Sequence, residues 1–438
     1  MDPVTIGAVS IIFLLILVLL GVHIGVALTT VSLVAIWIIT GNFSIAMSLI
    51  SNTYYHAVRD YVFAVIPLFI VMGIILSKAE LTQDLFGAAN VLLRRIKGGL
   101  AMATVAANAV FAAVVGSSVA SAAAFSKIAM GPMTELGYSK RLALGCIAGS
   151  SVLGMLIPPS ILFIVYGILT GESIGKLFIA GVVPGIVMAT IYCLGIALMI
   201  RVKPELIDQT ANKGLEEMSW KQWFTELVRP WPVILLIVIV LGGIYGGLFT
   251  PTEAAGVGVG GALLVALAKR RLSLKQCREI LIESSLTSGA ILFLLISAQI
   301  YARFIALSGL VQALNSWIIG LGLSQIPIVL IYIVIVFLLG MIIDSTSILL
   351  LTIPLILPVC KSLGIDLIWF GVITVISVEI GLITPPFGMS VYTVKASLGD
   401  TVALEEIFQG VMPYIIMMLL TIAILITFPI LCTWLPGL

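Results

Sequence analysis

Long apolar stretches that contain no Asp, Glu, Lys or Arg alternate with short polar segments along the chain. The stretches cover residues 4–22, 24–58, 98–126, 142–171, 177–200, 284–302, 304–343 and 407–438. About 20 apolar residues cross the hydrocarbon core of a bilayer as a helix. A helix satisfies its own backbone hydrogen bonds in lipid, and the alternation typical of a membrane β-barrel is absent. The pattern predicts an all-α polytopic membrane protein in a lipid bilayer.

The composition agrees with this fold class and narrows the range of molecules that the protein is expected to bind. Of the 438 residues, 61% are hydrophobic and 10% are charged, whereas soluble domains carry about 25% charged residues. The 22 basic and 20 acidic residues leave a net charge of +2, so we expect no nucleic-acid partner. The five widely spaced cysteines and two histidines form no zinc or haem motif.

Two proline pairs reveal an internal repeat. Pro158–Pro159 and Pro385–Pro386 lie 227 residues apart, and the same shift places residues 4–22 on 231–249. We predict two repeats, 1–201 and 230–438, joined by a connector over 202–229. The connector is charged, and its Trp220, Trp223 and Phe224 share one helical face. This amphipathic pattern predicts a segment lying at the membrane surface.

Basic loops predict that the two repeats have opposite orientations. The first repeat carries Lys78 and the 94–97 cluster, whereas the equivalent residues 305–324 have no charge. The second repeat has basic residues over 269–278, and its counterpart 42–51 has none. Basic residues mark cytoplasmic loops, so equivalent loops face opposite sides. We therefore expect inverted repeats, a cytoplasmic connector and two periplasmic termini, although the inside loop 395–406 has one base and three acids.

Each repeat contains a segment too interrupted to be a plain crossing. Residues 98–131 and 326–360 predict re-entrant hairpins, with turns at 116–121 and near 340–347. The helices over 140–170 and 366–394 are predicted to break at the proline pairs. Proline has no N–H, so nearby carbonyl oxygens lose helical partners and can bind a small cation. The helix N-termini at the hairpin turns favour an anion.

Ionisable residues inside apolar stretches are rare and are candidates for function. Asp344, at the second hairpin turn, is the first candidate for a role in ion binding or gating. Glu379, just before the second break, is the next. Arg303 could attract an anion, but its position near an outer helix end also fits a side chain that extends to the membrane surface.

These motifs together resemble a known family. The resemblance rests on Gly116–Ser117–Ser118, Ile157–Pro158–Pro159–Ser160, Gly340 with Asp344, and Gly381–Leu382–Ile383–Thr384–Pro385–Pro386. Their set and order resemble the large membrane subunit of tripartite ATP-independent periplasmic (TRAP) transporters over essentially the whole chain. The resemblance implies an elevator-type secondary transporter of the ion-transporter superfamily in the bacterial inner membrane. It also implies a small four-helix membrane subunit, a periplasmic substrate-binding protein, a carboxylate substrate and coupling to sodium ions.

The resemblance also implies site residues. One sodium site would involve Ser117, Gly154, Ile157 and Pro159, and the other Gly340, Gly381, Thr384 and Phe387, mostly through backbone carbonyls. Residues implied in substrate binding or gating are Ser118, Ser121, Asp344 and Ser345.

Three other functions are weighed against this interpretation. A stand-alone sodium/anion symporter of the same superfamily would carry Ser-Asn-Thr at both hairpin turns, but the only such triplet here is 51–53, in a predicted surface connector. A channel also suits a broken helix, and saturable, partner-dependent uptake would distinguish the two. An enzyme is not expected, because Ser118 has no nearby base in this arrangement.

Overall fold

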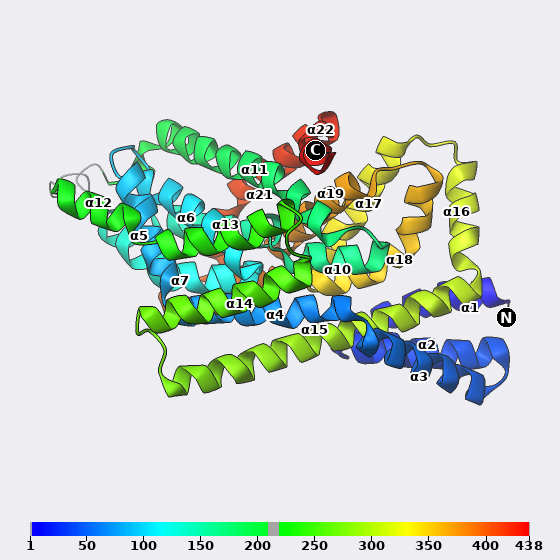
Figure 1. Ribbon diagram of the computed structural model, residues 1–438. Helices are drawn as coiled ribbons and strands as arrows, with labels where there is room; N and C mark the ends of the chain where they lie inside the picture. The colour runs from blue at the N-terminus through cyan, green and yellow to red at the C-terminus, as the bar shows by residue number, and fades with distance from the viewer. Residues whose placement is uncertain (1, 209–218, 438) are drawn as a thin grey trace.

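The computed structural model describes residues 2–208 and 219–437, and in these residues the regular elements are helices, without strands (Figure 1). The helices of the first half are α1 (Pro3–Leu19), α2 (Ile24–Thr40), α3 (Phe43–Arg59), α4 (Val65–Lys78), α5 (Leu81–Leu93), α6 (Gly99–Val115), α7 (Ser118–Glu135), α8 (Lys140–Ser151), α9 (Leu153–Leu156), α10 (Ile161–Thr170) and α11 (Ile174–Val202). Those of the second half are α12 (Trp220–Val228), α13 (Trp231–Tyr245), α14 (Pro251–Ala268), α15 (Leu274–Ser308), α16 (Leu310–Gly320), α17 (Gln325–Gly340), α18 (Ser345–Ser362), α19 (Leu367–Leu382), α20 (Met389–Leu398), α21 (Leu404–Thr427) and α22 (Ile430–Thr433).

The molecule is elongated, and many of its helices run along its length (Figure 1). Among the described residues, eight helical segments are long and apolar enough to cross a membrane. The longest helix, α15, has 35 residues, which corresponds to about 52 Å and exceeds the thickness of the hydrocarbon core. The all-α multi-pass fold predicted from the apolar stretches is therefore confirmed.

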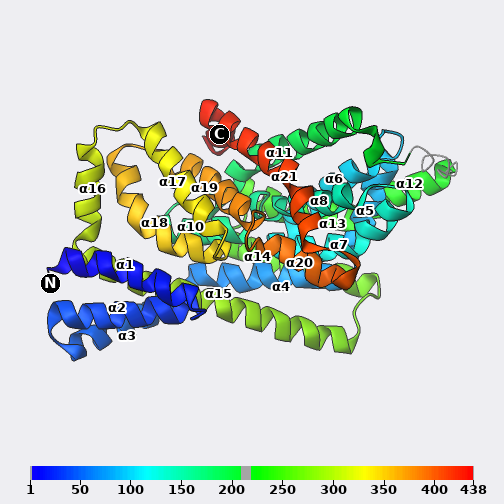
Figure 2. The same ribbon diagram turned by 180° about the vertical axis from the view of Figure 1, so that it is seen from behind.

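One layer of the molecule consists of helices from both halves that pack side by side. Helix α15 packs against α2 and α4, and α4 also packs against α14. In Figures 1 and 2 these helices lie together along one edge of the molecule. Glycines on α14 permit close packing: a Cβ atom on Gly258 would lie 2.4 Å from the sulfur of Met72. Small residues serve this purpose in membrane helices.

The other layer contains two helical hairpins and two interrupted helices. Helices α6 and α7 form the first hairpin, which packs against α8 and α20. Helices α17 and α18 form the second, which packs against α19 and α10. Each hairpin thus packs against a helix that follows the proline pair of the opposite half, α20 in the first case and α10 in the second. Much of the buried apolar core lies here, including the fully buried Phe111, Phe125 and Phe163.

The order of elements is similar in the two halves. The hairpin α6–α7 has α17–α18 as its counterpart, and α8–α10 corresponds to α19–α20. The short helices α5 and α16 lie near opposite ends of the molecule (Figure 1). The division into inverted repeats at 1–201 and 230–438 stays a prediction that agrees with this order.

Two segments add detail to the sequence analysis. Residues 43–59, which include the triplet predicted to lie in a surface connector, form helix α3, because Ala46, Ile50, Thr53 and Ala57 recur on one buried face.

In the predicted connector between the repeats, α12 has an N-terminal capping box, and Trp220 stacks on Trp223 with ring centroids 5.0 Å apart. Residues 209–218 of the predicted connector lie outside the described residues.

Candidate functional site

The first break interrupts the chain between α9 and α10. The carbonyl of Gly154 would pair with the N–H of residue 158 in a continuous helix, but Pro158 has none. The chain restarts at Ser160, whose hydroxyl donates to the carbonyl of Met155 and accepts a hydrogen bond from the N–H of Phe163. Ser160 is thus the N-cap of α10. The interruption between α9 and α10 at the first proline pair leaves carbonyl groups without helical donors.

The turn of the first hairpin packs directly on this break. Gly116 adopts a φ of +63°, and a Cβ atom on it would lie 2.5 Å from the carbonyl oxygen of Pro159. A Cβ atom on Gly154 would lie 2.7 Å from the carbonyl oxygen of Ser117 and 3.0 Å from Oγ of Ser121. Only glycine allows such approaches at these two positions. The structure therefore brings Ser117, Gly154 and Pro159 together, as the first predicted cation site requires.

The second hairpin repeats this contact on the second break. A Cβ atom on Gly340, at the end of α17, would lie 2.8 Å from Cα of Gly381. A Cβ atom on Gly381 would lie 2.5 Å from Cα of Gly340. The two backbones touch because neither residue has a side chain. Two of the residues predicted for the second cation site therefore adjoin each other.

Thr384 and Phe387 flank the second proline pair in different environments. The Thr384 hydroxyl is buried and donates a hydrogen bond of 2.6 Å to the carbonyl of Ile380. Its oxygen keeps lone pairs that can face a cation. The Phe387 side chain is 54% exposed, so a role for this residue would rest on its backbone, as predicted.

Asp344 has a local structural role at the second hairpin turn. It is the N-cap of α18: Oδ1 accepts a hydrogen bond of 3.0 Å from the N–H of Ser347, and Oδ2 accepts the Ser347 hydroxyl. Ser345 is buried beside it. Asp344 therefore fixes the start of α18, and a role in ion binding or gating stays a prediction.

Glu379 is a buried acid without a partner among the described residues. It lies on α19, two positions before Gly381, and is 1% exposed. Its side chain approaches Ser118 of the first hairpin and Tyr192 of α11. Neither carboxylate oxygen has a hydrogen-bond partner in the described part of the chain, and the hydroxyls of Ser118 and Tyr192 also lack one. These unsatisfied groups lie where elements of the two halves meet.

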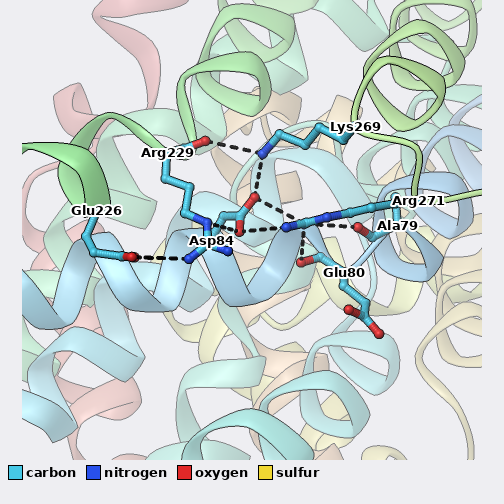
Figure 3. Close-up of polar contacts among 7 residues, drawn as sticks. All are labelled: Ala79, Glu80, Asp84, Glu226, Arg229, Lys269 and Arg271. Atoms are coloured by element: carbon cyan, nitrogen blue, oxygen red, sulfur yellow. Dashed lines mark hydrogen bonds and ion pairs between the residues drawn. The ribbon is translucent and has the colours of Figure 1, made fainter. Parts of the chain in front are cut away.

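A second buried acid, which the sequence analysis missed, lies at the end of the molecule that carries α12. Asp84 on α5 is 1% exposed and forms ion pairs with Arg229, Lys269 and Arg271 (Figure 3). Arg271 also donates to the carbonyl of Ala79, and Lys269 to that of Arg229. The cluster joins α5 to the end of α12 and to the basic loop after α14. The sequence offered one signal for this cluster: a single acid within α5 of the first half and a group of basic residues in the loop after α14 of the second half.

The family profile described as "Tripartite ATP-independent periplasmic transporter, DctM component" matches residues 11–431. The chain belongs to this family. The match covers both hairpins and both breaks, so the resemblance found from the motifs is confirmed.

Several curated members of the DctM family are similar to the chain. A C4-dicarboxylate TRAP transporter large permease protein from Pseudomonas aeruginosa is 34% identical over 86% of this chain and 87% of its own length. An ectoine TRAP transporter large permease protein from Halomonas elongata is 32% identical over 94% and 95%. A sialic acid TRAP transporter permease protein from Haemophilus influenzae is 29% identical over 85% of this chain and 59% of its own length.

A solved structure supports the fold. The YdaH transporter of Alcanivorax borkumensis superposes with a TM-score of 0.56, covering 89% of this chain and 88% of its own, at 13% sequence identity. At this identity the likeness shows the fold alone.

Membership of the DctM family settles the class of protein. The chain is a multi-pass membrane subunit of a bacterial TRAP transporter and not an enzyme. Such a subunit acts with a small membrane subunit and a periplasmic binding protein. Of the predicted site residues, Ser117, Ser121, Gly154 and Pro159 lie at the contact of the first hairpin with the first break, and Gly340 and Gly381 adjoin at the second. Glu379, on the helix that carries Gly381, approaches Ser118 of the first hairpin.

Proposed function

We propose that this subunit imports a carboxylate-bearing solute, delivered by the binding protein, by an elevator movement coupled to a sodium gradient. The observation that carries the proposal is the paired contact of each hairpin turn with the break of its own half, at Gly154 and at Gly340. Broken helices of repeated halves are a recurrent place for substrates and coupling ions in secondary transporters.

Sodium binding is supported by the oxygen chemistry of the two contacts. Small hard cations prefer carbonyl, carboxylate and hydroxyl oxygens. In the first site we place Ser117, Gly154, Ile157 and Pro159. In the second we place Gly340, Gly381, Thr384 and Phe387. The close backbone approaches at both sites leave no room for side chains beside these oxygens.

The burial of the Glu379 carboxylate supports the proposal that a cation binds near the two breaks. An ionised carboxylate that is buried without donors or a counter-charge is strongly unfavourable. A sodium ion bound near Ser118 or Gly381 would supply the missing positive charge. Since α19 carries both Glu379 and Gly381, cation binding would also fix the break of this helix.

A carboxylate substrate is supported by the relatives and by the hairpin turns. Relatives named for C4-dicarboxylates, sialic acid and ectoine outnumber the one named for isethionate, a sulfonate, and the first three solutes all carry a carboxylate group. Helices α7 and α18 begin at the turns, and a helix N-terminus attracts an anion. We assign Ser118, Ser121, Asp344 and Ser345 to substrate binding or gating there.

The packing supports an elevator. The hairpins and interrupted helices contact one another across the two halves, so they can move as one body. Helices α2, α4, α14 and α15 form a separate layer. We place the connector in the cytoplasm and both termini in the periplasm of the inner membrane, because basic residues gather near α5, α12 and the loop after α14.

Reconstituted uptake tests the proposal. The chain, its small subunit and its binding protein are placed in proteoliposomes and offered succinate, sialic acid or ectoine as labelled probes. We expect saturable, binding-protein-dependent uptake of at least one probe that requires an inward sodium gradient. Undiminished uptake driven by a proton gradient without sodium would contradict the coupling, and non-saturable flux without the binding protein would indicate a channel.

A further inference from the structure

Arg303 lies near the extracytoplasmic end of α15 in the proposed orientation and is unpaired. Its side chain is exposed, and no hydrogen bond or ion pair joins it to another residue in the part of the chain that the structure describes. An arginine within an apolar helix usually has a partner or a function. The guanidinium group offers five N–H donors in a planar fork that matches a carboxylate.

Arg303 borders a hollow of about 600 Å³ between α10, α15, α16 and α18. This volume lies within the range of sites for small molecules. Its walls combine apolar side chains, such as Ile168 and Leu357, with polar ones from α15 and α16. One wall, α18, belongs to the second hairpin, and the opposite wall, α15, belongs to the other layer.

The polar residues of this hollow offer further donors. The side-chain amides of Gln299 and Gln312 have no hydrogen bond within the described residues. The side-chain amide nitrogen of Asn315 donates to the Ser362 hydroxyl at 3.0 Å, and its Oδ1, which is an acceptor, is buried without a partner among the described residues. Amide N–H groups beside a guanidinium group form a suitable environment for carboxylate oxygens.

The charge of the hollow is positive. Within residues 2–208 and 219–437, Arg303 is the one charged residue among the side chains that line it, and no acid lines it. A second hollow of about 520 Å³ also borders Arg303, on the side of α3, and its other lining residues include Asn42, Ser44 and Ser48. Arg303 thus lies between two hollows with uncharged polar groups, and nothing in either lining neutralises it.

The position fits the arrival of a solute from outside. The hollow is formed partly by α16, which lies with the N-terminus at one end of the molecule, whereas α12 and the Asp84 cluster lie at the other end (Figure 1). In the proposed orientation this is the periplasmic end, where the binding protein releases its solute.

We propose that the hollow between α15, α16 and α18 is a vestibule in which Arg303 binds the carboxylate of the incoming solute, assisted by the amides of Gln299 and Gln312. The inference rests on the proposed transport of a carboxylate. Binding here precedes transfer to the hairpin turns, and it explains an unpaired guanidinium facing a hollow without acids.

The charge inside the hollow can be measured by thiol labelling, without a transport assay. In the complex with the small subunit, reconstituted after removal of the five native cysteines, Ala306→Cys places a thiol in the hollow without removing a proposed donor. The variant is labelled with an anionic sulfonate and with a cationic ammonium methanethiosulfonate. We expect Arg303→Gln to lower the ratio of the anionic to the cationic rate about fivefold. Lys361→Gln, which removes an exposed charge at the end of α18 outside the hollow, should leave the ratio unchanged. An equal ratio with and without Arg303 would overturn the proposal.

Two further measurements identify the anion that binds Arg303. Protection by succinate tests for a carboxylate, and a change of vesicle composition tests for the phosphate of a lipid headgroup. Succinate should slow the anionic labelling of Ala306→Cys more than sodium chloride of equal ionic strength, and this protection should disappear with Arg303→Gln. Anionic lipid alters the local concentrations of both charged reagents, so the effect of Arg303→Gln on the rate ratio is compared: it should be the same in vesicles of phosphatidylcholine and in vesicles that also contain phosphatidylglycerol. Absence of protection, or an effect of Arg303→Gln that disappears when phosphatidylglycerol is added, would overturn the proposal, the latter in favour of a lipid headgroup. Neither labelling result depends on sodium-driven uptake, so the vestibule and the coupling can fail separately.

Discussion

Gly154 contacts Ser117 so closely that a Cβ atom on Gly154 would lie 2.7 Å from the Ser117 carbonyl oxygen. The contact joins the break between α9 and α10 to the turn of the first hairpin. Because Gly154 has no side chain, backbone carbonyl groups of the break and of the hairpin turn lie close together. The account of the first cation site depends on this contact.

Gly154→Ala should abolish most sodium-dependent uptake, because the added methyl group must displace the backbone of Ser117. Uptake as a function of sodium concentration measures the effect. Gly256→Ala on α14 is the matched control, since a Cβ atom there meets nothing within 4 Å. Equal sodium dependence of the two variants would show that the contact is not part of a cation site.

Gly340→Ala should have a similar effect at the second contact, where the methyl group would meet the backbone of Gly381. Gly289→Ala on α15 has open space around it and serves as the control. Uptake and the amount of folded protein are measured together. A Gly340→Ala protein that folds and transports like the control would exclude close packing of the second turn as a requirement.

Thr384→Ala should raise the sodium concentration needed for half-maximal uptake, because the variant loses a hydroxyl oxygen at the second break. Thr384→Ser keeps the oxygen and should behave like the natural protein. Thr393→Ala, which removes an exposed hydroxyl that also bonds to its own helix, is the control. An unchanged sodium dependence in Thr384→Ala would remove this residue from the site.

Asp344→Asn separates the charge of Asp344 from its capping role. Asparagine caps a helix about as well as aspartate, so α18 should keep its N-terminus and the protein should insert and fold. We expect reduced transport, because the proposed role of Asp344 in ion binding or gating uses its charge. Transport equal to that of the natural protein would leave Asp344 as a cap alone.

Asp84→Asn should destabilise the protein by roughly 2–3 kcal/mol, because it leaves three cations without their buried counter-charge. Thermal unfolding of the purified protein measures the change. Asp400→Asn, which removes an exposed partner of Lys395, should change the stability little. Similar unfolding temperatures for the two variants would show that the cluster at Asp84 does not hold α5 and α12 together.

Local signals in the sequence predicted the elements of the site. Pro158 and Pro385 remove N–H donors wherever the chain folds, and Gly116 with Ser117 ends one helix and begins the next by local capping. Contacts between residues that are distant in the sequence were harder to predict from it. Asp84 meets cations more than 140 positions away, and Glu379 approaches Ser118 and Tyr192 from another half. These contacts depend on how helices cross, which no local pattern records.

Simultaneous measurement of sodium and solute influx tests the central claim most directly. Proteoliposomes containing the complex receive labelled sodium, and a transported probe is added with the binding protein. We predict that addition of the solute starts sodium influx in a fixed ratio to solute influx, and that Gly154→Ala removes both. Solute accumulation without sodium influx, or sodium influx that does not depend on the solute, would contradict the account.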